Sequence, residues 1–142
     1  MPVDEVGRVP GLVVVSTSRA DGTIQSSVVN AGVIDHPVTG QPVVAFVAAG
    51  SALRLRNLRA RPRATVVMRA GWQWTGVEGP VQLAGPDDPL DGIDEERLRL
   101  LLREIFTAAG GTHEDWDEYD RVMRDQHRTA VLVTPERVYS NG

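Results

Sequence analysis

Five arginines crowd the segment RLRNLRARPR, residues 54 to 63, although the whole chain carries a net charge of -4. A guanidinium presents its N–H donors in a planar fork, which suits the recognition of a phosphate or a carboxylate. The acids lie mostly elsewhere, with five acids and eight arginines in residues 1 to 83 against fourteen acids and seven arginines in residues 84 to 142. The cluster therefore belongs to a mildly basic half of the chain and could bind an anion.

The residues around this cluster predict a short helix that Ser51 can cap and that Pro62 ends. The start of a helix offers free N–H groups and a positive dipole end to an anion. Arg54 falls in the first turn, so Ser51, Arg54 and Asn57 could together hold a phosphate. The residues alone leave a second interpretation open, in which all five arginines are solvated or paired with the acidic half.

The pair of tryptophans in GWQW, Trp72 and Trp74, is the second informative feature. Residues two apart in a strand share one face of it. These side chains could pack in the core or in a subunit interface, and they could also flank a flat ring system.

Other side chains give little support to common catalytic or metal sites. His36, His113 and His127 lack metal-ligand spacing and are interpreted as solvated or capping residues. The carboxylates between positions 87 and 125 are interpreted as solvated helix faces, and no GxSxG serine motif is present. The absence of cysteine excludes disulfides and thiolate catalysis. We therefore predict no metal site and assign no catalytic residue.

Composition also bounds the partners. A nucleic-acid surface needs a broad basic face with aromatic residues, whereas aromatics make up only 5% here, so we expect no nucleic-acid partner. No apolar run approaches the roughly 18 residues that span a bilayer, and no signal-peptide pattern is present. We expect a cytoplasmic protein without membrane insertion.

Short β-branched segments separated by turn residues predict an antiparallel barrel, in one α+β domain over residues 1 to 142. Helices are expected at 93–109 and from 112 to about 126, the second one capped by Thr112 in a box with Asp115. The expected strands are 11–18, 23–34, 43–49, 63–70, 72–85, 129–135 and 137–140.

Three segments taken in order, RNLRARPRATVVM, GWQWTGVEGPVQL and HEDWDEYDRVMRDQHRTAVLVTPERVYS, resemble the pyridoxamine 5'-phosphate oxidase-like split β-barrel proteins. The resemblance covers roughly residues 11 to 140 and is closest to the deazaflavin (coenzyme F420)-dependent oxidoreductases of actinobacteria. It implies an antiparallel FMN-binding split barrel with a short helix after the third strand and a helical pair before the last strands. It also implies a homodimer with its cofactor sites at the subunit interface.

The same resemblance implies which residues contact the cofactor. Arg54 matches the basic position before RNL that binds the phosphate, and Ser51 and Asn57 lie beside it. Ala52 stands where the family often has a second basic residue, so one phosphate contact is missing. Trp72 and Trp74 would reach the site from the partner subunit. The residues expected along the ring are Gln25, Ser26, Ser27, Val28 and Val29.

We therefore predict an oxidoreductase that uses F420 to transfer hydride to a conjugated or aromatic small-molecule acceptor. In such an enzyme the chemistry belongs to the cofactor, and the protein supplies binding and orientation. Two alternatives remain: an enzyme of the same fold that uses FMN, and a dimer that binds a flavin or deazaflavin without catalysis.

Overall fold

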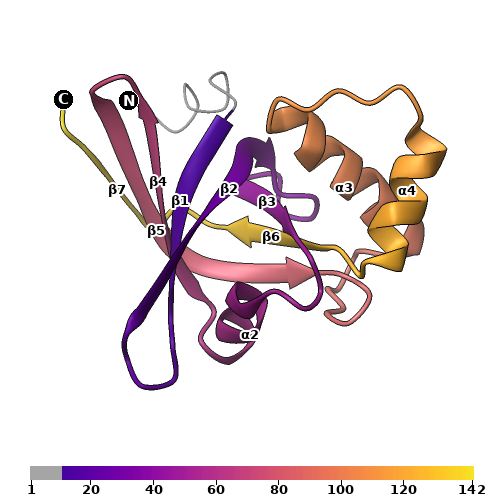
Figure 1. Ribbon diagram of the computed structural model, residues 1–142, viewed down its shortest axis with the longest axis horizontal. Coiled ribbons are helices and arrows are strands. Elements are labelled where there is room, and N and C mark those ends of the chain that lie inside the picture. Colours follow the sequence, from indigo (N-terminus) through magenta and orange to yellow (C-terminus); the bar gives the residue numbers. More distant parts are fainter. Residues whose placement is uncertain (1–10) are drawn as a thin grey trace.

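Seven antiparallel strands form one sheet, and six of them close into a barrel (Figure 1). The computed structural model describes residues 11–142. The strand order is β4-β1-β2-β3-β6-β5-β7; pairing of β4 with β5 closes the barrel and leaves β7 on the edge of β5. The strands are β1 (Gly11–Ser18), β2 (Ile24–Asp35), β3 (Pro42–Ala48), β4 (Arg63–Ala70), β5 (Gln73–Ala84), β6 (Thr129–Val133) and β7 (Arg137–Ser140).

Helices in the described part of the chain occupy two of the connections between strands. α2 (Leu53–Ala60) joins β3 to β4 and lies at one end of the barrel. α3 (Glu95–Ala108) and α4 (Trp116–Asp125) join β5 to β6 and pack side by side (Figure 1). The predicted α+β split barrel, with its short helix after the third strand and its helical pair before the last strands, is confirmed. The predicted single domain also included residues 1–10, which lie outside the described residues.

Aspartates cap both helices of the pair. The side chain of Asp94 accepts a hydrogen bond from the N–H of Arg97 at 2.7 Å, and Asp115 accepts one from Glu118 at 3.1 Å. The predicted cap at Thr112 is wrong, because the cap must directly precede the first helical residue and α4 begins at Trp116.

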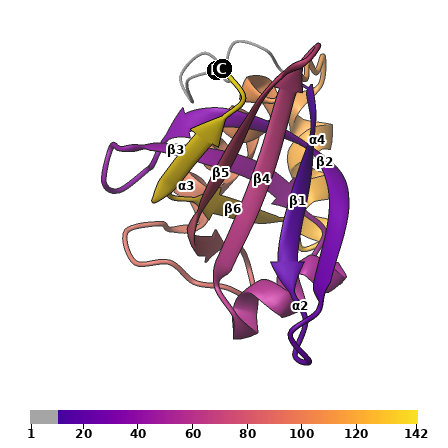
Figure 2. The ribbon, with the colours of Figure 1, turned by 90° about the vertical axis from the view of Figure 1, so that its left-hand side faces the viewer.

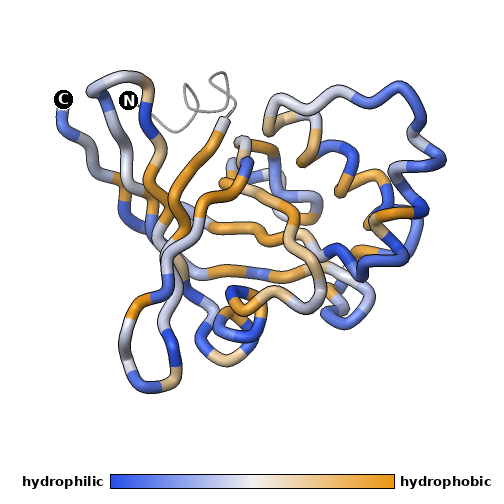
Figure 3. Tube along the Cα trace, viewed as in Figure 1, coloured by the Kyte–Doolittle hydropathy of each residue, from blue (hydrophilic) through white to orange (hydrophobic). Residues whose placement is uncertain are grey.

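Two clusters of buried side chains fill the molecule, and β3 contributes to both. Val44 and Phe46 point into the barrel, whereas Val43 and Ala45 face the cluster formed with α3 and α4. This placement explains the nearly continuous apolar run in that strand and confirms the predicted central strand buried on both faces. Figure 3 shows apolar residues along the strands that line the barrel, polar residues in the turns, and both kinds along the helices.

The strand β2 pairs with β3 over only part of its length. It pairs with β1 from Ile24 to Ala31, but with β3 only from Ala31 to Asp35. Among the described residues, the edge that faces away from β1 is therefore unpaired over residues 24–30. This opening of the barrel lies along the segment that the sequence predicted to contact a cofactor ring.

The outer face of β1, β2 and β4 carries apolar side chains. Val28 lies opposite Val14, and Val14 opposite Val67, so three valines form a row across the strands. These side chains are 37–59% exposed, and Leu12 on the same strand as Val14 is 67% exposed. Figure 2 looks onto this side of the barrel, with α3 and α4 behind it. The described chain therefore leaves this apolar face open.

Candidate functional site

The start of α2 has no side-chain cap. Ala52 occupies the cap position in an extended conformation, so the predicted capping role of Ser51, which lies one residue too early and is exposed, is wrong. The N–H groups of the first helical turn consequently lack a side-chain acceptor. Together with the positive end of the helix dipole they make this end of α2 suitable for an anion.

Arg54 lies in this first turn and is half-buried. Its Nε atom is shielded from solvent and has no hydrogen-bond partner, and the guanidinium forms no ion pair within residues 11–142. Burial, and then the nearby charge of Arg128, lower the pKa of Arg54, although an arginine stays charged at neutral pH. A buried charged donor without a partner is energetically costly, and an anion at this position would remove that cost.

Most other arginines of the cluster have partners inside the protein. Arg59 holds Asp88 at 2.7 Å, and Arg63 holds Glu136 at 2.8 Å. The Nε of Arg61 donates to the carbonyl of Ser18 at 2.8 Å. Pairing within the protein therefore describes Arg59, Arg61 and Arg63. Arg54 is the half-buried arginine of the cluster that has no such partner within residues 11–142.

Asn57, the third residue predicted beside the phosphate, is buried in the protein. Its amide nitrogen donates to the hydroxyl of Thr17 at 3.1 Å, and its amide oxygen accepts from Arg61 at 3.5 Å. The first bond attaches α2 to β1, and the second joins Asn57 to the residue that directly follows α2. A direct contact between Asn57 and a phosphate stays a prediction.

The five predicted residues of β2 divide between its two faces, because side chains alternate along a strand. Gln25, Ser27 and Val29 lie opposite inward-facing residues of β1, whereas Ser26 and Val28 point outward. Within residues 11–142, Ser27 Oγ is buried and has no hydrogen-bond partner, like Arg54 Nε. One flat ring can therefore contact either the inward-facing side chains or the outward-facing side chains, but not both. The main-chain groups along the unpaired edge of β2 are accessible to a ring on either face.

The tryptophan pair does not share a strand face. Trp72 lies in the turn before β5 and is 94% exposed, while Trp74 lies within β5 and packs edge-on against Tyr139 of β7, with ring centroids 6.2 Å apart. The expectation failed because β5 begins at Gln73 and not before Trp72. Trp72 remains available to another molecule.

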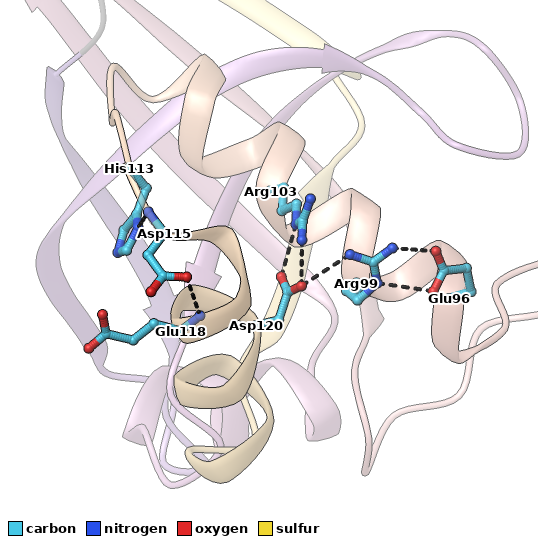
Figure 4. A network of polar contacts seen from close by, with 7 residues as sticks. All are labelled: Glu96, Arg99, Arg103, His113, Asp115, Glu118 and Asp120. Atoms are coloured by element: carbon cyan, nitrogen blue, oxygen red, sulfur yellow. Dashed lines mark hydrogen bonds and ion pairs between the residues drawn. The ribbon is translucent and has the colours of Figure 1, made fainter.

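An ionic network joins α3 to α4 (Figure 4). Asp120 accepts hydrogen bonds from Arg103 at 2.6 Å and from Arg99 at 3.0 Å, and Arg99 also pairs with Glu96. The carboxylate of Asp120 is only 13% exposed, so its predicted place on a solvated helix face is wrong. Hydrogen bonds from Arg103 and Arg99 hold the pKa of Asp120 below its usual range.

A pocket of about 680 Å³ lies beside this network. Its apolar wall comes from residues such as Leu90, Ile93 and Met123, and its polar residues include Arg124 and Arg128. It lies between the 84–94 segment and the helical pair, and neither Arg54 nor the predicted residues of β2 line it. The pocket therefore differs from the start of α2 in its lining, although Arg128 borders the pocket and is also the charge that acts on Arg54.

The three histidines have structural contacts. His36 is buried, and its Nδ1 accepts hydrogen bonds from the N–H groups of Val38 and Thr39, so it caps the turn after β2. In the described part of the chain, no group of three metal-ligating side chains is close enough to hold an ion. Among the same residues, no helix has the length and apolar character needed to cross a bilayer.

Sequence reasoning missed Arg128, which follows α4 and influences Arg54 electrostatically. The two residues lie far apart along the chain, and only the pairing of β3 with β6 brings their segments together. No local pattern around Arg128 indicates this neighbour, so the sequence alone could not have identified it.

No protein-family model matches the chain, and no curated protein matches it in sequence. Solved structures do match. The conserved hypothetical protein Rv2991 from Mycobacterium tuberculosis superposes with a TM-score of 0.71 at 16% identity, over 99% of this chain and 84% of that one.

Two further solved structures carry more descriptive names. An F420 reductase matches with a TM-score of 0.67 at 14% identity, over 98% of this chain and 97% of that one. A pyridoxamine 5'-phosphate oxidase-related, FMN-binding protein from Nostoc punctiforme matches with a TM-score of 0.65 at 12% identity, over 96% of this chain and 78% of that one. Identities this low establish the architecture alone, and the chain has the α+β split-barrel fold.

Proposed function

We propose that this protein is an oxidoreductase that binds a flavin-type cofactor through a phosphate at Arg54. The observation that carries the proposal is the buried Nε of Arg54, which lacks a partner at the uncapped start of α2. Leaving a buried donor unpaired costs about 1–3 kcal/mol. A phosphate at the guanidinium would neutralise its charge, and a change of the Arg54 rotamer would let a phosphate oxygen reach Nε.

Bound in this way, the cofactor supplies hydride transfer, and the protein supplies position and surroundings. The fork of Arg54 and the first-turn N–H groups of α2 would hold the phosphate. The ring would follow the unpaired edge of β2, where the hydroxyl of Ser27 is a second buried group without a partner. A flat ring held there would leave a slot for a conjugated or aromatic acceptor, brought into reach by orientation.

We propose the deazaflavin F420 as the cofactor and keep FMN as the alternative. Both have support, because the matching structures include a protein named as an F420 reductase and one named as FMN-binding. Fluorescence titration of the purified protein with each cofactor would decide between them. Micromolar binding of FMN without a response to the deazaflavin would reverse this preference.

We also propose that the protein is a homodimer that buries the valine row of β1, β2 and β4. Val14 lies at the centre of this row and is 42% exposed, in a face that the described chain leaves open. A charge at this position should oppose burial against a second copy. We expect Val14→Asp to shift the protein from dimer to monomer in analytical ultracentrifugation.

The control for this variant is Val38→Asp, which places the same charge at a 55% exposed valine in the turn after β2. It should leave the oligomeric state unchanged. A wild-type protein that sediments as a monomer at all concentrations would contradict the dimer.

Arg54→Gln tests the cofactor site. We expect the affinity for the cofactor to fall about tenfold to hundredfold, since a hydrogen bond to a charged group contributes about 1.5–3 kcal/mol. Arg56→Gln removes the same charge from an exposed position on the same helix and should bind like the wild type. Equal affinity of Arg54→Gln and the wild type would place the phosphate elsewhere.

A further inference from the structure

We infer that Arg128 is the second cation of the phosphate site, so that the anion is held between two guanidinium groups. The inference rests on the proposed function, because it takes Arg54 as the anchor of the cofactor phosphate. Arg128 would supply the positive charge that Ala52 does not provide at the start of α2.

The pairing of β3 with β6 places the two arginines on neighbouring segments. This ladder ends at the pair Ala48 and Thr129, so the chain that leaves β3 toward α2 runs beside the chain that enters β6. The N–H of Gly50 donates to the carbonyl of Gln126 at 3.2 Å across this junction. The turn before β6 therefore rests directly on the turn that begins α2.

Close packing fixes this arrangement. A side chain at Gly50 would place its Cβ 2.8 Å from the Cβ of His127, which is closer than such atoms approach in proteins. His127 has a φ of 50°, a left-handed conformation, and the N–H of Arg128 closes the end of α4 on the carbonyl of Met123 at 2.9 Å. The backbone that carries Arg128 is thus held by bonds and contacts on both sides.

The guanidinium of Arg128 is available to a ligand. Its Nε donates to Gln126 at 2.8 Å, and its terminal nitrogens have no partner within residues 11–142. The carboxylates of neighbouring segments are already engaged: Asp87 with His127, Asp88 with Arg59, and Asp120 with Arg99 and Arg103.

The two arginines are therefore carried on neighbouring segments, both are partly buried, and neither forms an ion pair within residues 11–142. The lowered pKa of Arg54, caused first by burial and then by Arg128, agrees with this proximity. Such a pair is unfavourable in the free protein and attracts an anion strongly. Two guanidinium forks also match the several acceptor oxygens of a phosphate ester better than one fork does.

Arg128→Gln tests the inference by comparing ligands that differ only in the phosphate. We expect the dissociation constant for FMN to rise at least tenfold, while riboflavin, which lacks the phosphate, binds as it does to the wild type. We expect the same rise in the dissociation constant for the deazaflavin. Arg124→Gln is the matched control, because Arg124 lies on the last turn of α4 and forms no ion pair in the described chain.

Stability of the free protein provides a readout independent of cofactor chemistry. Removing one of two repelling charges should raise the midpoint of thermal unfolding of Arg128→Gln by a few degrees without ligand. Arg128→Lys keeps the charge and loses the fork, so its midpoint should stay near the wild-type value and its FMN affinity should lie between the two. Lower stability of Arg128→Gln would mean that Arg128 is structural, and would overturn the inference.

Inorganic phosphate separates failure of the inference from failure of the proposed function. We expect phosphate, at matched ionic strength, to stabilise the wild type and to lose most of this effect in Arg54→Gln and in Arg128→Gln. If no flavin binds but this pattern appears, the two-arginine site stands and the proposed function fails. If flavin binding depends on Arg54 and not on Arg128, the proposed function stands and this inference fails. No effect of phosphate on the wild type would also overturn it.

Discussion

Arginines at two places in this molecule have opposite surroundings. Between α3 and α4, Arg99 and Arg103 share the carboxylate of Asp120, and Glu96 completes the network (Figure 4). At the start of α2, Arg54 has a buried nitrogen without a partner, and its charged neighbour is Arg128. In the first arrangement the arginines are paired with carboxylates of the same chain, whereas in the second the arginines have no carboxylate partner within residues 11–142.

This difference distinguishes arginines that hold two helices together from arginines that can bind an anion. A guanidinium that already holds a carboxylate joins two helices and has little left to offer a ligand. A guanidinium without a counter-charge weakens the free protein but can bind an anion without first breaking an ion pair. A high local density of arginine is therefore a poor indicator of a binding site, and the informative property is which arginine lacks an acid.

The largest loss of stability is expected from disrupting the contact between Gly50 and His127, next to Arg54 and Arg128. In Gly50→Ala the new methyl group would meet the Cβ of His127 at 2.8 Å and its carbonyl oxygen at 2.9 Å. Forcing these segments apart should lower the free energy of unfolding by about 2–3 kcal/mol in urea denaturation. It should also weaken cofactor binding, because Arg54 and Arg128 would separate.

Gly11→Ala serves as the control, because a Cβ at Gly11 meets no atom of residues 11–142 within 4 Å. It should unfold like the wild type. A Gly50→Ala protein with unchanged stability and unchanged binding would show that the junction can relax without moving the arginines.

A smaller effect is expected from the paired region. Asp120→Asn leaves Arg99 and Arg103 without their shared carboxylate, and should lower the free energy of unfolding by about 1–2 kcal/mol at neutral pH, because the site is only partly accessible. Glu96→Gln should have a weaker effect, since the Glu96 side chain is 64% exposed. Equal losses in the two variants would mean that burial of Asp120 contributes nothing.

The pH dependence of the Asp120→Asn effect sharpens the comparison further. The pKa of Asp120 is lowered in the folded protein, chiefly by Arg103, so its stabilising contribution is present above the unfolded value of about 4. That contribution is lost as the pH falls through the lower folded value. The difference between wild type and variant, measured by urea unfolding, should therefore shrink below about pH 4 and stay constant above it.

Much of the fold could be predicted from local patterns. The β-branched runs gave the bounds of β1 and β4 as 11–18 and 63–70, which the structure reproduces. The alternation of turn residues placed the hairpins, and Gly22 and Gly71 have the positive φ values that such turns need. Helix starts were harder to place. Ser51 and Thr112 were predicted as caps, but the cap positions are occupied by Ala52 and Asp115.

The candidate site was predictable only in part. The place of Arg54 in the first turn of a short helix could be predicted from nearby residues, whereas its role as a phosphate ligand stays a prediction. Its relation to Arg128 depends on the register between β3 and β6, which is a property of the closed barrel. The separation of Trp72 from Trp74 likewise depends on where one turn ends, and a shift of one residue changes the face of a strand that a side chain occupies.

The late position of β6 in the chain has a consequence for biosynthesis. Arg54 is made early, but the segment that carries Arg128 emerges only with the last strands, and contacts between distant parts of a chain form slowly. A ligand that needs both residues can protect only the completed molecule, by an amount that increases with its concentration. A truncated product that ends before Arg128 would gain no such protection.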